Sequence, residues 1–318
     1  MNRTLLYFLL RRLGHTALVL VGVMVVVFTL VHLVPGDPVR VALGTRYTEE
    51  SYNALRAASG LDQPLLVQFF SYVGNAITGN LGVSFRNGDP VTQVLLARLP
   101  ATLSLAIAGM VVALLIAVPL GLYAALNEGK TSDGIIRAVS QFGVSVPDFW
   151  MGLLLIILFS SVLGWLPPSG YVPLTEDPLG WLSRVTLPAV TVGLVAGSIM
   201  TRYIRAAVLD VMGASYIRTA RSKGLKRNVV IGRHIVRNAL VPVLTIGGIQ
   251  MATMLGGLIV VEVVFAWPGL GRLVFDAVAA RDYAVIQGAV LLIAAMFLLI
   301  NLIVDLLYAV ADPRIRVS

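Results

Sequence analysis

The sequence predicts an all-α polytopic membrane protein with six transmembrane helices. Of its 318 residues, 58% are hydrophobic and 13% are charged, whereas a soluble domain carries about 25% charged residues. The mean hydropathy is +0.88. Charge-free intervals recur along the chain, and each is long enough for the roughly 20 residues that a membrane-crossing helix needs. We therefore expect a bundle of apolar helices and no separate soluble domain.

The expected spans follow from these intervals in chain order. They cover Thr16–Val34, Leu99–Asn127, Ala138–Leu166, Val185 to just beyond Arg205, the interval between Arg237 and Glu262, and the interval between Asp282 and Asp305. The first interval ends in HLVPGDP, without a small-x-small cleavage site. This ending favours an uncleaved span over a cleaved signal peptide.

Two of these spans contain residues that a membrane helix rarely carries. Pro147 and Asp148 interrupt the third span, where we expect a kink or a helix cap. Arg202 and Arg205 lie near the end of the fourth span. Their long side chains can reach the membrane interface while the helix continues in the bilayer.

The distribution of lysine and arginine predicts the orientation in the membrane. Nine of the 24 Lys and Arg residues lie between Arg202 and Arg237, against one acid, Asp210. Short loops rich in Lys and Arg stay on the cytoplasmic side of a membrane. Because an even number of spans puts both ends of a chain on one side, we expect both termini to be cytoplasmic.

The same reasoning divides the chain into three regions. Residues 1–34 hold the N-terminal segment and the first span. Residues 35–98 form the longest connection, and its five Arg residues are matched by five acids. We expect this connection to be a partly helical extracytoplasmic element that serves as a lid or a docking surface. Residues 99–318 form a core of five spans with a cytoplasmic loop near 210–237.

The chain shows no motif for catalysis or cofactor binding of its own. Gly129-Lys130-Thr131 looks like the end of a phosphate-binding loop, but Ala124 stands where that motif needs its first glycine. The three histidines form no HExxH pair and there are no cysteines, which argues against a zinc protease and excludes thiolate sites. The net charge of +8 is concentrated beside the membrane, which favours lipid headgroups over nucleic acid as its partner.

The segment from Tyr216 to Pro242, YIRTARSKGLKRNVVIGRHIVRNALVP, resembles the cytoplasmic coupling loop of bacterial ABC importer permeases. It is most similar to the version found in the dipeptide/oligopeptide permease family. The general importer pattern is Glu-Ala-Ala, three residues, then Gly. Here Arg218-Thr219-Ala220 precede Gly224, so the glutamate is absent and one alanine is kept.

Further stretches carry the same resemblance in order along the chain. They are PGDP at 35–38, GLDQP at 60–64, GNLGVS at 79–84, RLPAT at 98–102, PDFW at 147–150, and the segments 262–282 and 301–316. The resemblance therefore covers essentially the whole chain. It is specific for the family and says little about the particular substrate.

The resemblance implies the permease subunit of an ATP-driven importer for di- or oligopeptides in the bacterial cytoplasmic membrane, working by alternating access. The implied partners are a second homologous permease, two ATP-binding subunits that hold ATP and Mg, and an extracytoplasmic substrate-binding protein. The residues that would contact the ATPase are Tyr216, Arg218, Thr219, Ala220, Arg221 and Gly224. Small Ala220 and Gly224, four residues apart, would let a short helix approach its partner closely. The residues that would provide an anchor ring and charge around them are Tyr216, Arg218, Arg221 and Lys223.

Ionisable and polar residues within the spans are candidates for the substrate path, because a charge in a bilayer is usually functional. Glu262 ends the fifth span just before WPGLG, so it would either contact substrate or face water. Gln250 lies in the same span and is a second candidate. Asp305, four residues after Asn301, is expected to pair with a neighbouring helix.

Other functions remain open at this point. The same architecture could import nickel chelates or glutathione, because selectivity in such systems lies largely with the binding protein. A secondary transporter would need intramembrane acid or base relays and usually an internal repeat, and the sequence shows neither clearly. A channel or structural membrane component would have no need of the basic coupling segment.

Overall fold

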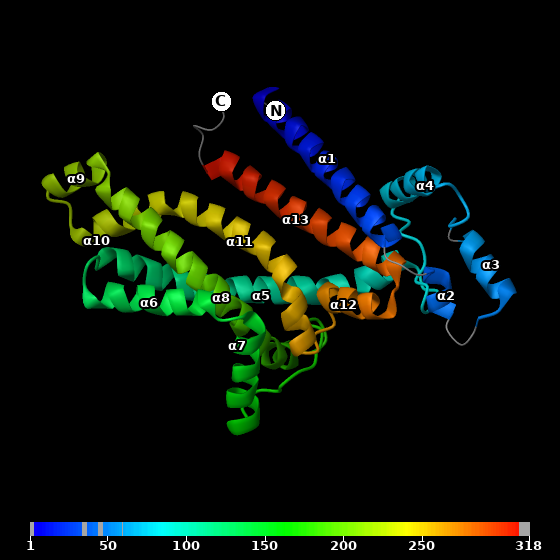
Figure 1. The fold of residues 1–318 in the computed structure, drawn as a ribbon. Helices are drawn as coiled ribbons and strands as arrows, with labels where there is room; N and C mark the ends of the chain where they lie inside the picture. Colours follow the sequence, from blue (N-terminus) through cyan, green and yellow to red (C-terminus); the bar gives the residue numbers. More distant parts are fainter. Residues whose placement is uncertain (1–2, 34–36, 44–46, 59, 312–318) are drawn as a thin grey trace. The chain divides into compact units, whose positions relative to one another are not determined.

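The computed structural model describes residues 3–33, 37–43, 47–58 and 60–311, and almost all of its regular structure is helical (Figure 1). The one bridge of β type in the described residues pairs Val83 with Pro90. The chain divides into two compact units. The first takes its described residues from Met1–Thr102 and Pro268–Leu298, and the second from Leu103–Trp267 and Leu299–Ser318.

The expected all-α polytopic architecture is confirmed. Five described helices are long and apolar enough to cross a membrane, and a sharply bent helix pair makes a sixth if it is counted as one span. The five spans are Arg11–Leu33, Val91–Leu126, Pro178–Gly213, Pro242–Val264 and Tyr283–Val304. Each is close to an interval that the charge pattern predicted.

The third predicted span differs from a simple helix. It consists of α6 (Thr131–Ser145), α7 (Asp148–Leu155) and a π-helical segment, η2 (Ile156–Val162). The chain bends by 102° between α6 and the half formed by α7 and η2. Val146 is extended, with φ −85° and ψ 126°, because a residue before proline avoids the helical conformation. The expected kink is confirmed. Pro147 occupies the N-cap position of α7 without a side-chain cap, so the alternative of an Asp148 cap is wrong.

The first unit contains the N-terminal span and several shorter helices. Its elements are α1 (Arg3–Leu33), α2 (Pro38–Leu43), α3 (Glu49–Ala58), α4 (Leu65–Ile77), the start of α5 (Val91–Leu126), α12 (Leu270–Ala280) and most of α13 (Tyr283–Ala311). Buried Asp282 holds the start of α13 by accepting hydrogen bonds from the Ser84 hydroxyl and the Phe85 amide. The Leu270 amide at the start of α12 donates to the Thr102 hydroxyl at 2.7 Å.

The second unit is organised around α8 (Pro178–Gly213), which contacts α6, α7 and α11 (Arg237–Val264) (Figure 1). Asp177 caps α8 by accepting from the Gly180 amide at 2.9 Å, and Pro178 occupies the first turn, where proline is well tolerated. A Cβ on Gly193 would lie 2.5 Å from Val112 of α5. Only glycine allows the two helices to approach this closely.

Three short elements follow α8. They are α9 (Ser215–Ser222), α10 (Arg227–Val229) and a π-helical segment, η3 (Val230–Val236), which runs directly into α11. Ala214 separates α8 from α9 with an extended backbone, φ −64° and ψ 144°. The basic loop predicted from the sequence is therefore a compact helical connection.

Candidate functional site

The segment that resembles a coupling loop contains α9, which contacts α8 and η3. Ile217 and Ala220 are buried, whereas Tyr216, Arg218 and Arg221 are exposed. Burial of positions three residues apart is what an amphipathic helix gives when one side faces its own chain. This short helix therefore presents a tyrosine and two arginines outward from a small apolar base.

The structure separates the two small residues that were expected to form one close-approach surface. Ala220 faces the interior of its own unit, while Gly224 is exposed beyond the end of α9. Thr219 is also exposed, and its hydroxyl donates to the Ser215 carbonyl within the helix at 3.2 Å. Alanine at position 220 is thus required first by packing within the chain.

Gly224 ends α9 in a defined way. Its φ is +74°, in the left-handed region that glycine enters without penalty. Its amide donates to the Arg221 carbonyl at 2.9 Å, and the Leu225 amide donates to the Ala220 carbonyl at 3.4 Å. These two bonds form a Schellman C-cap. The glycine of the coupling pattern is therefore a helix stop that turns the chain toward α10.

A buried ion pair joins α6 to α8 about three turns before α9. Asp133 accepts from Arg205 twice, Oδ1 from Nε at 2.7 Å and Oδ2 from Nη2 at 2.8 Å. The side chains are 1% and 18% exposed. Arg202 donates from Nη1 to Gln141 Oε1 at 3.0 Å. Both arginines therefore contact α6.

This ion pair could not be found by reading motifs. The two residues are separated by 72 positions, and neither belongs to a recognisable pattern. A carboxylate inside a predicted apolar helix would have indicated a buried partner, because a buried charge needs one. Asp133 lies just before the predicted start of the third span at Ala138, so the sequence did not mark it as a charge within a span.

The two candidates for the substrate path lie apart on α11. Glu262 is fully buried, at 0% exposure, so the alternative that it faces water is wrong. Gln250 is half-buried, and twelve residues of helix place it about 18 Å away along the axis. The two residues therefore cannot form one site. The pairing expected of Asp305 concerns a side chain outside the described part.

The first unit contains a cavity of about 840 Å³ that the sequence did not reveal. It lies among α1, α4, the segment after α4 and the start of α13. Its polar lining includes His32, Gln68, Tyr72, Asn75, Tyr283 and Gln287. Burial raises the pKa of the Tyr72 hydroxyl to about 12, and this hydroxyl has no hydrogen-bond partner among the described residues.

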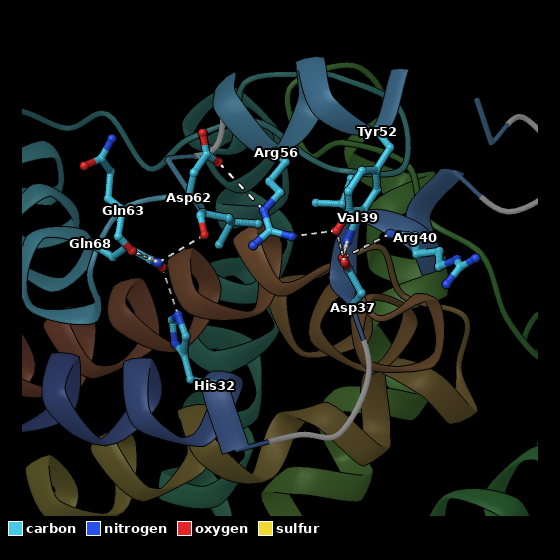
Figure 2. A network of polar contacts seen from close by, with 10 residues as sticks. His32, Asp37, Val39, Arg40, Tyr52, Arg56, Asp62, Gln63 and Gln68 are labelled. Carbon is cyan, nitrogen blue, oxygen red and sulfur yellow. Dashed lines mark hydrogen bonds and ion pairs between the residues drawn. The ribbon is translucent and has the colours of Figure 1, made fainter. Parts of the chain in front are cut away.

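A polar network at one side of this cavity ties α1 to α4 (Figure 2). His32 Nε2 lies 3.1 Å from Gln68 Oε1, and His32 Nδ1 lies 2.8 Å from the Phe28 carbonyl oxygen. The Gln68 amide nitrogen donates to the Gln63 carbonyl at 2.7 Å. The amide group of Gln68 thereby links the end of α1 to the chain that leads into α4.

A second network joins α2 to α3 at the same cavity (Figure 2). The Tyr52 hydroxyl donates to Asp37 and accepts from Arg56 Nη1 at 2.7 Å. Burial acts to raise the pKa of Asp37. Hydrogen bonds from Tyr52 and two backbone amides, with the positive charge of Arg56, outweigh burial and lower that pKa below its ordinary value. Asp37 is thus held as a carboxylate.

Among the described residues, no group of His, Cys, Asp and Glu is placed to hold a metal ion. The polar features of the described residues are the hydrogen-bonding side chains of the cavity, the buried Asp133–Arg205 ion pair and the exposed basic helix α9. Such a set suits binding and mechanical coupling.

Comparison with known proteins gives two kinds of match. Residues 117–317 match the family described as binding-protein-dependent transport system inner membrane component. Residues 5–106 match the family described as its membrane component, N-terminal part. A chain of the MetNI methionine ABC transporter, in an inward-facing conformation, superposes with a TM-score of 0.58. It is 16% identical, over 69% of this chain and 97% of that chain, and so supports the fold alone.

Two bacterial relatives match over nearly their whole length. The chain is 40% identical to the di/tripeptide transport system permease protein of Pseudomonas aeruginosa (strain UCBPP-PA14), covering 98% of this chain and 99% of that protein. It is also 40% identical to the dipeptide transport system permease protein of Escherichia coli (strain K12), with the same coverage.

Proposed function

Since this chain belongs to the family of binding-protein-dependent transport system inner membrane components, we propose that it is a permease subunit of an ATP-driven importer for di- and oligopeptides. The observation that carries the proposal is the extent of the similarity to two peptide permeases. It includes the segment between α1 and α5 as well as the core of spans. A shared core alone would support only the general class of importer.

In this proposal α9 is the coupling element. Its exposed Tyr216, Arg218 and Arg221 would contact an ATPase subunit, while its buried base joins it to α8 and η3. Closure of an ATPase pair around ATP would then move α9 together with α8, and the path would open alternately to each side. Such coupling requires that the partner contacts differ between the two states.

The proposal includes the remaining subunits and the orientation. A second homologous permease would complete the path, two ATPase subunits would hold ATP and Mg, and an extracytoplasmic binding protein would deliver substrate. This chain itself would hydrolyse nothing. Both termini and α9 would be cytoplasmic and residues 35–98 extracytoplasmic, as the distribution of Lys and Arg indicates. Half-buried Gln250 and buried Glu262 stay proposals for the path.

Uptake by a deletion strain tests this function directly. The strain lacks this gene and is complemented either with the wild type or with an empty vector. Uptake of a radiolabelled dipeptide, a longer peptide, glutathione and nickel is measured in parallel. We expect loss of peptide uptake in the deletion strain and its restoration by the wild-type gene.

The other cargoes give distinct outcomes. Loss of nickel or glutathione uptake with normal peptide uptake would keep the importer architecture and overturn the peptide assignment. Co-purification with two ATPase subunits separates an ABC importer from a secondary transporter or a channel. A tagged chain that purifies without any ATPase from cells with active uptake would contradict the proposed coupling.

A further inference from the structure

Helix α4 is amphipathic, and its apolar face points away from the protein. Leu66, Phe70 and Ile77 are 73%, 69% and 77% exposed, and with Val73 they recur at the spacing of one helical face. The opposite face carries Gln68, Ser71, Tyr72 and Asn75, which line the cavity. A helix on the surface of a soluble protein has the reverse arrangement.

The surroundings of this face are also uncharged. No Asp, Glu, Lys or Arg occurs between Asp62 and Arg86. None of the α4 side chains is buried. Contiguous exposed apolar surface of this kind marks a site that contacts either a membrane or another protein.

The depth of α4 in the membrane follows from its contacts with α1. Phe28 lies against Phe69 and Tyr72 with ring centroids 5.4 and 6.2 Å apart, and His32 contacts Gln68. Phe28 and His32 occupy the last turns of the candidate span Arg11–Leu33. A helix packed there lies where the span leaves the hydrocarbon and enters the headgroup region.

We propose that α4 is an interfacial helix whose apolar face, formed by Leu66, Phe70, Val73 and Ile77, is immersed in lipid. Helix α1 also exposes apolar side chains at this level, at Leu30 and Leu33. Interfacial helices bury their apolar side at the boundary of headgroups and acyl chains. The polar side of α4 then forms a cavity wall held at the membrane surface. The side of the membrane follows the proposed orientation, whereas contact with lipid does not depend on it.

The depth of the contacts between α4 and α1 favours lipid over a soluble protein as the partner of the apolar face. A soluble protein approaches a membrane from the water, so it reaches the headgroups and not the level of Phe28 within the apolar span. Lipid surrounds α1 at that level on the surfaces that no protein covers. Because α4 packs against Phe28, its outward face lies at the same level of the membrane.

Because the chain contains no cysteine, single-cysteine variants can be labelled without any background. Leu66→Cys, Phe70→Cys and Ile77→Cys place a nitroxide label on the apolar face. Asn75→Cys, on the polar face of the same helix, and Asp62→Cys, just before it, are matched controls. The full-length protein is reconstituted into vesicles of phosphatidylcholine and phosphatidylglycerol. Variants are compared only if their circular dichroism and gel-filtration profiles match the parent.

Collision rates with oxygen, which concentrates in lipid, and with a water-soluble nickel chelate are then measured by electron paramagnetic resonance. We expect the oxygen-to-nickel ratio at 66, 70 and 77 to exceed that at 62 and 75 by about threefold or more. Equal ratios, or greater nickel access at the three positions, would overturn the proposal. Low access to both reagents in the assembled transporter would assign the face to a protein partner and overturn it too.

Discussion

Arg205 of α8 donates two hydrogen bonds to the carboxylate of Asp133 of α6, and both side chains are largely buried. The Gly129 amide also donates to Asp133 Oδ2 at 3.2 Å, so the carboxylate is satisfied from two elements. Removing one member of such a pair leaves a buried charge without its partner. The pair therefore fixes how α6 sits against the helix that leads into α9.

The first prediction concerns this pair. Arg205→Ala should destabilise the protein by about 3 kcal/mol, because Asp133 is left buried and charged. Thermal unfolding in detergent measures the effect. Arg137→Ala is the control, since Arg137 is 3.7 Å from the same carboxylate but 60% exposed, and its loss should cost about 0.5 kcal/mol. Equal effects of the two substitutions would show that the bidentate pair has no special weight.

A second prediction concerns the end of α9. Gly224→Ala should destabilise the loop by about 1 kcal/mol, because φ of +74° is unfavourable for a residue with a Cβ. Gly213→Ala is the matched control, since Gly213 ends α8 with open space around it. Proteolytic nicking of the loop should accelerate in the first variant and stay unchanged in the second. Comparable nicking in both would argue against the helix stop.

The exposed face of α9 gives a third prediction. Arg218→Glu and Arg221→Glu should each weaken ATPase co-purification by about tenfold, because they reverse charge at the proposed contact. Arg227→Glu, in α10 of the same basic loop, should have little effect. Ala220→Arg is a poor probe, since Ala220 is buried and the substitution would disturb packing first. Full ATPase recovery with both α9 variants would remove this helix from the interface.

A fourth prediction concerns pH. The pKa of Asp37 in the folded state is lowered from its ordinary value of 3.8. The ionised carboxylate therefore stabilises the fold at pH values above 3.8, and this stabilisation is lost as the pH falls through the folded-state pKa. Asp37→Asn should therefore lower stability by about 1 kcal/mol at pH 6. The difference from wild type should shrink as the pH falls below 3.8. Melting curves from pH 6 to pH 3 test this, and a constant difference would show that the charge is irrelevant.

Orientation gives the fifth prediction. In intact spheroplasts, a membrane-impermeant maleimide should label Asn87→Cys in the connection before α5. It should label Ser222→Cys at the end of α9 only after permeabilisation. Both positions are exposed in the structure, so access is controlled by the membrane. The reverse pattern would invert the proposed topology.

The spans could be predicted because the bilayer imposes a length and excludes charge. The break at Pro147 could be predicted because proline acts on its own backbone and on the preceding residue. Pairing between Asp133 and Arg205 could not, because hydropathy does not say which helices pack together. A short helix such as α9 shows its apolar positions in sequence, but only packing against η3 shows that Ala220 belongs to the inner side.

Helix α4 illustrates the same limit from the opposite direction. The spacing of Leu66, Phe70, Val73 and Ile77 is visible in the sequence, and it predicts an amphipathic helix. Which face meets the protein is decided by tertiary contacts, and His32 and Phe28 of α1 meet the other side. An assignment of this apolar face to the protein core, made from the sequence alone, would therefore have been wrong.

Helix α8 runs from Pro178 to Gly213 with Pro188 inside it, and its length has a mechanical consequence. Its 36 residues rise about 54 Å along the helix axis, with the Asp177 cap at one end and α9 attached to the other. A tilt of about 5° around the capped end would carry α9 sideways by about 5 Å. The length of α8 thus amplifies motion in one direction and reduces it in the other. A small rotation of α8 among the spans displaces α9 by about one helical turn. A displacement of α9 by a partner, in turn, rotates α8 within the bundle by only a few degrees.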